Sequence, residues 1–191
     1  MADHEITTTN LVFQGWRKVY DLVVRSPSGA TFRREIVDRG SAAAVLPYDA
    51  RNRTVVLVRQ FRAPVMFCGG PEYLVETVAG LLDGDDPETC ARRETLEEAG
   101  LRIEALEPVG AAWSAPGATT ERIHMFLAPY TPESRVAAGG GLAEEHEELE
   151  VLEIGFDELD AMLARGEFLD LKTIVLIQAL KLKHAGLFAN P

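Results

Sequence analysis

The sequence has few cysteines and no long apolar run. These two features exclude several classes of protein. Its 191 residues include two cysteines, Cys68 and Cys90, which are too few for a disulfide framework. No Cys/His group has the spacing of a zinc site. No hydrophobic run approaches the roughly 20 residues that span a bilayer, and the N-terminus lacks a signal-peptide pattern. These absences predict a cytoplasmic protein that has no membrane partner.

Positive charge is also scarce. The chain carries 19 lysines and arginines against 30 aspartates and glutamates, which gives a formal net charge of −11 at pH 7. The phosphates of DNA or RNA would repel such a chain, so the sequence argues against nucleic acid as a partner. An anionic small molecule would need bound cations, or a few arginines at its pocket, to bind. With 47% hydrophobic and 26% charged residues, the composition is otherwise that of an ordinary globular protein.

One segment combines well-marked helix ends with an unfavourable charge pattern. Asp86 is a suitable N-cap, Pro87 occupies the first helical position, and Gly100 is placed to end the helix. Glu94 and Glu98 are four residues apart, and like charges at that spacing cost a helix roughly 0.2–0.5 kcal/mol per pair. A solvated acidic face would account for this pattern. A divalent cation such as Mg²⁺, which binds carboxylate oxygens, would also account for it.

The segment from Gly80 to Leu101 resembles the Nudix box, in which Gly, five residues, Glu and seven residues precede Arg-Glu-hydrophobic-any-Glu-Glu-any-Gly-hydrophobic. The matching positions are Gly80, Arg93, Glu94, Glu97, Glu98, Gly100 and Leu101. There are three departures. Asp86 stands in place of glutamate, only six residues separate it from Arg93, and Thr95 replaces an aliphatic residue. The shortened box is similar to that of the GDP-mannose pyrophosphatase branch of the Nudix superfamily, which also includes ADP-ribose pyrophosphatases.

This resemblance implies an α/β fold. The Nudix domain, an α/β/α sandwich with a mixed sheet, would occupy residues 41–191, and an N-terminal β-hairpin extension would occupy residues 1–40. The implied activity is Mg²⁺-dependent hydrolysis of the pyrophosphate bond of a nucleotide sugar, with Mn²⁺ as an alternative ion. GDP-mannose, cleaved to GMP and mannose 1-phosphate, is the first expected substrate, and ADP-ribose is the second. A Nudix-fold sensor that binds a nucleotide sugar without hydrolysing it is a third reading, which the retained box glutamates disfavour.

The resemblance also assigns roles to residues of the box. It implies that Glu94, Glu98 and the backbone carbonyl of Ala79 are metal ligands and that Glu97 takes part in catalysis. Arg93 lies four residues before Glu97, so the two can form an ion pair that fixes the rotamer of Glu97.

A second acidic stretch lies at residues 144–148, behind three glycines at 139–141 that predict a mobile hinge. By resemblance, this loop supplies the last carboxylate of the site. Counting back from the strand expected at 149–154 selects Glu147 as metal ligand or general base. Glu144 and Glu145 remain alternatives, and a solvated acidic loop is the plain reading.

Six more positions match nucleotide-sugar contacts of the family branch: Arg33, Arg34, Glu35, Arg62, Glu121 and Lys172. The resemblance further implies that the N-terminal hairpin forms a homodimer and reaches the site of the partner. Each position also has a structural alternative. The first three would be ordinary charges on a surface hairpin, Arg62 would end a strand in solvent, Glu121 would belong to a turn, and Lys172 would be one more surface lysine.

Hydrophobic periodicity and turn residues predict the remaining elements. Residues 1–14 are interpreted as a polar lead-in and 64–71 as an irregular loop. Strands are expected at 16–24, 31–38, 42–48, 54–60, 72–79, 104–113, 122–128 and 149–154, and amphipathic helices at 156–165 and 170–184.

Overall fold

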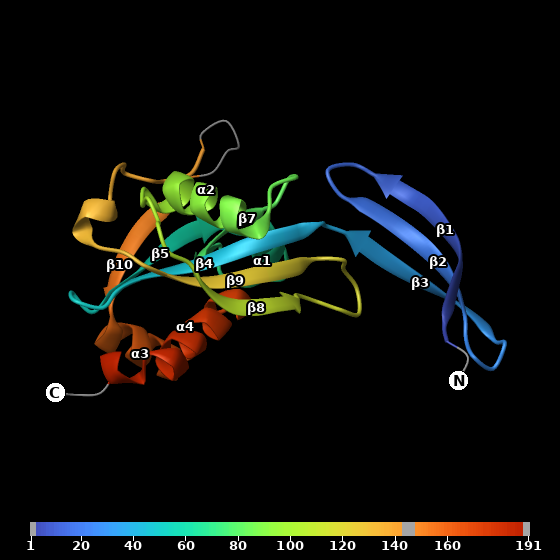
Figure 1. Ribbon diagram of the computed structural model, residues 1–191. Coiled ribbons are helices and arrows are strands. Elements are labelled where there is room, and N and C mark those ends of the chain that lie inside the picture. The colour runs from blue at the N-terminus through green and yellow to red at the C-terminus, as the bar shows by residue number, and fades with distance from the viewer. Residues whose placement is uncertain (1–2, 143–147, 189–191) are drawn as a thin grey trace. The chain divides into compact units, whose positions relative to one another are not determined.

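The computed structural model describes residues 3–142 and 148–188, which form a mixed α/β protein (Figure 1). The strands are β1 (Glu5–Gln14), β2 (Lys18–Arg25), β3 (Thr31–Asp38), β4 (Ser41–Asp49), β5 (Thr54–Phe61), β6 (Tyr73–Glu76), β7 (Val78–Leu81), β8 (Glu107–Trp113), β9 (Arg122–Pro129) and β10 (Glu150–Gly155). The helices are α1 (Ala63–Phe67), α2 (Pro87–Ala99), α3 (Phe156–Ala164) and α4 (Leu171–Lys183), with 3₁₀ turns η1 (Pro132–Ser134) and η3 (Ala185–Leu187). None of the helices in the described ranges is long and apolar enough to cross a membrane.

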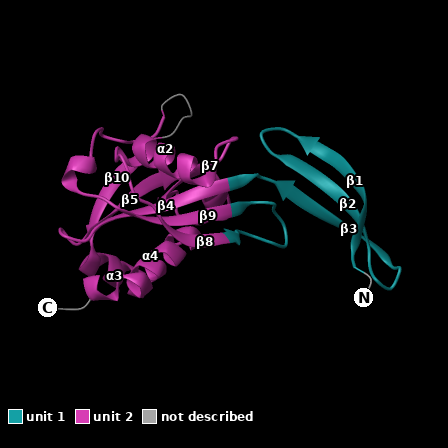
Figure 2. Ribbon diagram, viewed as in Figure 1, with its two compact units in different colours: residues 1–41, 112–122 teal, residues 42–111, 123–191 magenta. Residues whose placement is uncertain are grey.

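The chain divides into two compact units (Figure 2). The first unit comprises residues 1–41 and 112–122, and the second comprises residues 42–111 and 123–191. Within the first unit, the amide of Val37 donates to the carbonyl of Ala118 at 2.9 Å, and the amide of Thr120 donates to the carbonyl of Val37 at 3.0 Å. These bonds attach the 112–122 segment to the end of β3.

The first unit contains a three-stranded antiparallel sheet in the order β1-β2-β3, in place of the predicted two-stranded hairpin. The predicted lead-in of residues 1–14 was wrong, because most of it forms β1. All ten residues of β1 are exposed, so no alternation of buried and exposed side chains marks it as a strand. Its pairing with β2 rests on backbone hydrogen bonds, which leave no hydrophobic pattern in the sequence.

The second unit is built on a seven-stranded sheet. Five strands follow the order β10-β5-β4-β9-β8, β6 pairs with β5, and β7 pairs with β4. Strand β4 is buried on both faces, since Ala43 and Val45 pack in one hydrophobic cluster with residues of α2. The alternate residues Ala44 and Leu46 pack in the other cluster with residues of α3 and α4. Helices on both faces of a mixed sheet confirm the predicted α/β/α sandwich (Figure 1).

The strand expected at 72–79 is divided at Thr77 into β6 and β7. The Thr77 amide donates to the hydroxyl of Thr173 on α4 at 2.8 Å, and its own hydroxyl donates to the carbonyl of Val45. The chain therefore leaves β5 at Thr77 and joins β4, where Ala79 pairs with Ala44. This crossing carries Ala79 and Gly80 to the start of the loop that precedes α2.

Candidate active site

Helix α2 begins and ends where the sequence predicts. The Asp86 side chain accepts hydrogen bonds from the amides of Glu88 and Thr89 at 3.0 and 3.1 Å, and from the Thr89 hydroxyl at 2.6 Å. The Thr89 hydroxyl is the main cause of a lowered pKa at Asp86. At the other end Gly100 adopts a left-handed conformation with φ of 68°. These caps fix the helix that carries the four charged residues of the box.

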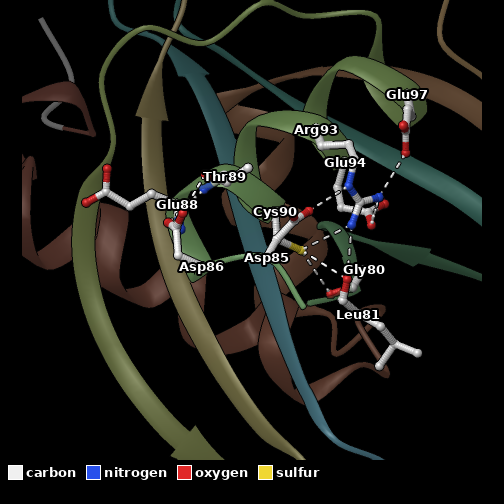
Figure 3. Close-up of polar contacts among 10 residues, drawn as sticks. All are labelled: Gly80, Leu81, Asp85, Asp86, Glu88, Thr89, Cys90, Arg93, Glu94 and Glu97. Atoms are coloured by element: carbon white, nitrogen blue, oxygen red, sulfur yellow. Dashed lines mark hydrogen bonds and ion pairs between the residues drawn. The ribbon is translucent and has the colours of Figure 1, made fainter. Parts of the chain in front are cut away.

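Arg93 is the centre of the charged cluster on α2 (Figure 3). Its Nη1 donates to Glu94 Oε1 at 2.7 Å and to Glu97 Oε2 at 3.2 Å, so the predicted pairing with Glu97 is confirmed. Its Nη2 donates to the carbonyl of Leu81 at 3.1 Å, and its Nε donates to Asp85 Oδ2 at 3.2 Å. Burial opposes the charge of Arg93, but these carboxylates, Glu94 foremost, raise its pKa above the usual value. One guanidinium thus holds two glutamates of the helix and the loop before it.

The loop carboxylate that pairs with Arg93 is Asp85, which was not predicted from the sequence. Asp86, which was predicted to hold the first acidic position of the box, caps the helix instead. Seven residues lie between Asp85 and Arg93, so the family spacing to the arginine is intact from Asp85. The missing residue falls earlier, between Gly80 and Asp85, and this spacing is the signal that could have identified Asp85.

Gly80 makes the space in which the Glu94 carboxylate lies. A Cβ atom on Gly80 would be 1.9 Å from both the carboxyl carbon and Oε1 of Glu94. One turn further along α2, the buried Glu98 accepts a hydrogen bond through Oε2 from the amide of Ala79 at 3.2 Å. The two carboxylates that are four residues apart therefore both lie against the Ala79–Gly80 end of β7.

Cys90 links the same end of β7 to helix α2 through hydrogen bonds. Its thiol lies 3.2 Å from the carbonyl oxygen of Leu81 and 3.6 Å from that of Gly80, and it donates to these acceptors. Burial, followed by the nearby Glu94 carboxylate, raises the pKa of the Cys90 thiol to about 11, so the group is neutral at pH 7. Cys90 is therefore a small packed residue rather than a nucleophile.

The donor set around Ala79 suits a hard divalent cation. Glu94 and Glu98 offer carboxylate oxygens, the Ala79 carbonyl belongs to the same strand end, and Gly80 leaves a cradle that a side chain would fill. Among residues 3–142 and 148–188, no three His, Cys, Asp or Glu side chains form a ready ligand cluster. The described residues thus offer two carboxylates and one backbone carbonyl to such an ion. Glu147, Glu144 and Glu145 lie outside the described residues.

Arg62 and Lys172, two predicted substrate contacts, are brought together by Glu76. Arg62 donates to both oxygens of Glu76, from Nε at 2.6 Å and from Nη2 at 2.8 Å, and Lys172 Nζ donates to Oε2. Glu76 is only 2% exposed. Burial opposes its charge, but the bond from Arg62 and the charge of Lys172 hold the pKa of Glu76 below its usual value. Glu76 was not predicted as a site residue, although a carboxylate within the apolar stretch 73–79 is itself a signal.

The glycines at 139–141 pack against the end of α2 and were misinterpreted as a mobile hinge. The amide of Gly140 donates to the Glu98 carbonyl at 2.8 Å, and the amide of Gly141 donates to the Glu97 carbonyl at 3.2 Å. A Cβ on Gly139 would lie 2.4 Å from the carbonyl oxygen of Glu98. These glycines allow close approach and supply the hydrogen-bond donors that the last carbonyls of the helix require.

The first unit holds the remaining predicted substrate contacts. Arg33 pairs with the buried Asp21, and Arg34 Nη1 donates to the Arg33 carbonyl at 2.8 Å. Both arginines line one open hollow, whose other lining residues are Val12, Asp21 and Glu35. In the same unit, Glu121 is paired with Arg39 at 3.2 Å. The structure thus groups residues 33–35 at one hollow and gives Glu121 a separate cationic partner.

Comparison with known proteins gives the chain a family. Residues 38–174 match the NUDIX domain family. The GDP-mannose pyrophosphatase of Cronobacter sakazakii is 44% identical over 165 residues, which cover 86% of this chain and 85% of that protein. A GDP-mannose pyrophosphatase of Escherichia coli is 41% identical over 185 residues, covering 96% and 92%.

A solved structure supports the same fold. The crystal structure of an ADP compounds hydrolase superposes with a TM-score of 0.76 at 16% sequence identity, over 97% of this chain and 96% of that one. At this identity the likeness bears on the fold alone. The domain match, the two relatives and the box geometry on α2 lead to one conclusion: the chain belongs to the Nudix family.

Proposed function

We propose that this protein hydrolyses the pyrophosphate bond of a nucleoside diphosphate sugar, with GDP-mannose as the preferred substrate. The main support for this proposal is the Arg93-centred cluster. In it, Glu94, Glu97 and Asp85 all pair with one guanidinium, and the Glu94 carboxylate lies in the space left by Gly80. The choice of GDP-mannose is supported by relatives of that activity at 41% and 44% identity, aligned over most of both chains.

Residues of β7 and α2 are proposed to bind the metal ion and to orient the catalytic carboxylates. Glu94 and Glu98, with the Ala79 carbonyl, would hold Mg²⁺, or Mn²⁺ in its place. The ion when bound supplies charge neutralisation at the phosphates and lowers the pKa of a bound water. Arg93 fixes the rotamers of Glu94 and Glu97 before substrate arrives, so the carboxylates need little reorganisation. Glu97, which shares Arg93 Nη1 with Glu94, is proposed as a further catalytic carboxylate.

The proton acceptor that we propose is Glu147, with Glu144 and Glu145 as alternatives in the same loop. It would take a proton from the water that attacks phosphorus, a contribution of roughly 10²–10⁴-fold for a positioned base. The water oxygen bonds to one phosphorus, the bridging P–O bond breaks, and GMP and mannose 1-phosphate leave. Glu148, the last residue of the acidic stretch, lies within the described part of the chain and is exposed.

Cationic side chains would bind the sugar nucleotide, which is itself an anion. Arg62 and Lys172 are proposed to contact it, and the family resemblance adds Arg33, Arg34, Glu35 and Glu121 as further proposed contacts. An arginine can hold a phosphate by two parallel hydrogen bonds, which gives direction as well as charge. The four cations among these contacts would provide the local positive charge that a chain of net charge −11 otherwise lacks.

We further propose that the first unit forms a homodimer interface. Strand β1 is an edge strand of ten residues with every residue exposed, and such edges invite pairing with another chain. Leu11, Val12 and Phe13 on this strand are 47–59% exposed and apolar. Light scattering coupled to size exclusion would measure the mass, and a Phe13→Ser variant that stayed as large as the wild type would argue against this interface.

A cytoplasmic location completes the proposal. Both cysteines are free thiols, which fits a reducing compartment.

Product analysis tests the activity directly. With Mg²⁺ present, GDP-mannose should yield GMP and mannose 1-phosphate clearly faster than ADP-ribose yields AMP and ribose 5-phosphate. The reverse preference would move the protein to the ADP-ribose group and leave the mechanism unchanged. Binding without turnover of any nucleotide sugar would make the protein a Nudix-fold sensor.

Two isosteric variants test the site. Glu94→Gln and Glu98→Gln each remove one proposed ligand charge and keep the shape of the side chain. Both should lose most turnover, and titration calorimetry should show weaker Mg²⁺ binding. Glu158→Gln is the matched control, because Glu158 forms an exposed pair with Arg165 on α3. Full turnover in either box variant would remove that residue from the site.

A further inference from the structure

Glu76 is the buried anion of a four-residue charge cluster that joins three elements of the second unit. Arg62 follows β5 and precedes α1, Glu76 ends β6, and Lys172 lies in the first turn of α4. Lys172 also lies 3.0 Å from Asp170, the N-cap of α4. The side chains differ in exposure, because Arg62 is 36% exposed and Lys172 12%, whereas that of Glu76 is 2% exposed. The anion is at the base of the cluster, and Arg62 is the member that solvent reaches most.

The hydrogen bonds of Glu76 leave both cations little freedom. The carboxylate accepts two parallel bonds from Arg62, the geometry that fixes a guanidinium plane most firmly. Its Oε2 also accepts the bond from Lys172, so the ammonium and the guanidinium share one oxygen atom. Arg62 donates hydrogen bonds to Glu76 from Nε and Nη2. Within the described residues, its Nη1 forms no hydrogen bond. Among the described side chains, Nη1 is thus the guanidinium nitrogen that Glu76 does not engage.

The backbone around the cluster is equally fixed. The Arg62 amide donates to the carbonyl of Glu72 at 2.9 Å, and Glu76 pairs with Val58 in the β5–β6 ladder. The next residue, Thr77, bonds to Thr173 beside Lys172. Ala79 follows only three residues after Glu76. Strand β6, which carries Glu76, therefore leads through Thr77 directly into β7, the strand that enters the proposed metal site.

The cluster is also coupled electrostatically to that site. Burial lowers the pKa of Arg62, but the hydrogen bonds and charge of Glu76 raise it by more. The charges of Glu98 and Asp170 raise the pKa of Arg62 further. Glu98 is one of the proposed metal ligands. Arg62 thus lies within electrostatic range of Glu98 on α2.

We infer that Glu76 is a positioning residue, which holds Arg62 and Lys172 side by side as a paired cationic contact for an anionic group of the substrate. This inference rests on the proposed function, because the two cations are assigned to substrate there. Glu76 itself is too buried to touch substrate and acts only through its two partners. Without its charge, the two cations would repel one another and lose the shared acceptor that sets their spacing.

Steady-state kinetics on Glu76→Gln tests this role. The amide keeps the shape of the side chain but directs an NH₂ group at one of the cations. We expect KM for GDP-mannose to rise by about tenfold or more, with a smaller change in kcat, because misplaced contacts weaken binding steeply. Glu76→Asp keeps the buried charge but is too short to reach both cations, so it should fold and give an intermediate KM.

A double-mutant cycle separates positioning from general stability. If Glu76 acts through Arg62, then adding Glu76→Gln to Arg62→Ala should raise KM by much less than Glu76→Gln does alone. The matched control is Asp160→Asn, which removes the ion pair to Lys181 at the far end of α4. It should leave KM unchanged. Equal effects of Asp160→Asn and Glu76→Gln, additive effects in the cycle, or an unchanged KM in Glu76→Gln would each overturn the inference.

Titration calorimetry with GDP separates this inference from the proposed function. GDP carries the anionic phosphates but cannot release a sugar phosphate. If wild-type protein hydrolyses no nucleotide sugar yet loses GDP affinity on Glu76→Gln, the proposed function fails and the positioning role stands. If hydrolysis occurs but neither KM nor GDP affinity responds to Glu76→Gln, only the positioning role fails. Wild-type protein that neither hydrolyses nor binds would overturn both.

Discussion

The Glu94 carboxylate occupies the space that a side chain on Gly80 would need. A Cβ at Gly80 would lie 1.9 Å from the Glu94 carboxyl carbon. The group in the way is the far end of a flexible side chain rather than backbone, so it can turn aside, although it then loses its ion pair with Arg93. A substitution here would therefore displace a proposed metal ligand without opening the core.

Gly80→Ala should accordingly separate activity from stability. We expect turnover to fall by about 10²-fold, the scale of a misplacement near 1 Å, while the thermal midpoint stays close to that of the wild type. Gly186→Ala is the control, since a Cβ there meets nothing within 4 Å. Turnover and calorimetric Mg²⁺ affinity would be measured for both variants. Wild-type turnover in Gly80→Ala would show that Glu94 is not needed in its present position.

The neighbouring aspartates of the loop should respond in opposite ways. Asp85 pairs with Arg93, whereas Asp86 only caps α2. Asp85→Asn should lower turnover, because Arg93 loses one of its anchors, and should change the thermal midpoint little. Asp86→Ala should lower the thermal midpoint, and Asp86→Asn should restore it, because asparagine caps helices as well as aspartate does. If Asp86→Asn reduced turnover more than Asp85→Asn, the assignment of the two roles would be reversed.

Local signals were enough to predict most of the second unit. Asp86, Pro87 and Gly100 mark the ends of α2 by chemistry that acts within a few residues. The doubly buried β4 reads as a continuous apolar run because helices cover both faces of the sheet. Strand β1 had no such signal. All its side chains face solvent, and it pairs with β2 through backbone hydrogen bonds, which do not depend on the side-chain pattern.

The site was less predictable because its geometry depends on long-range contacts. Arg62 and Lys172 are 110 residues apart in sequence, and only the fold shows that Glu76 lies between them. Asp85 could have been found from its spacing to Arg93. It was passed over because the next residue, Asp86, is the N-cap that the sequence marks most clearly. The glycines at 139–141 were interpreted by their flexibility, whereas their role depends on the helix end they approach.

Gly139→Ala should destabilise the second unit strongly. Gly139 has φ of +74°, a conformation that costs a residue with a Cβ roughly 1–2 kcal/mol. The added Cβ would also lie 2.4 Å from the Glu98 carbonyl oxygen, a backbone atom at the end of α2. Gly166→Ala is the matched control, with φ of +70° and nothing within 4 Å. Urea unfolding should show a clearly larger loss for Gly139→Ala, and equal losses would mean that the close approach carries no energy.

The acid limb of the stability curve should contain a contribution from Glu76. Burial opposes its charge, but Arg62 and Lys172 hold its folded pKa below the ordinary glutamate value of 4.5. The unfolded chain therefore binds the proton first as pH falls, and stability that is fully present above pH 4.5 is lost as pH drops through the folded pKa. Urea midpoints measured from pH 6 to pH 3 should fall more steeply for wild type than for Glu76→Gln. Because Glu76→Gln lacks the titrating group, its midpoint is lower at pH 6 and the two curves converge towards low pH. Parallel curves would show that the carboxylate does not change its pKa on folding, and that its pairing with the two cations adds nothing to stability.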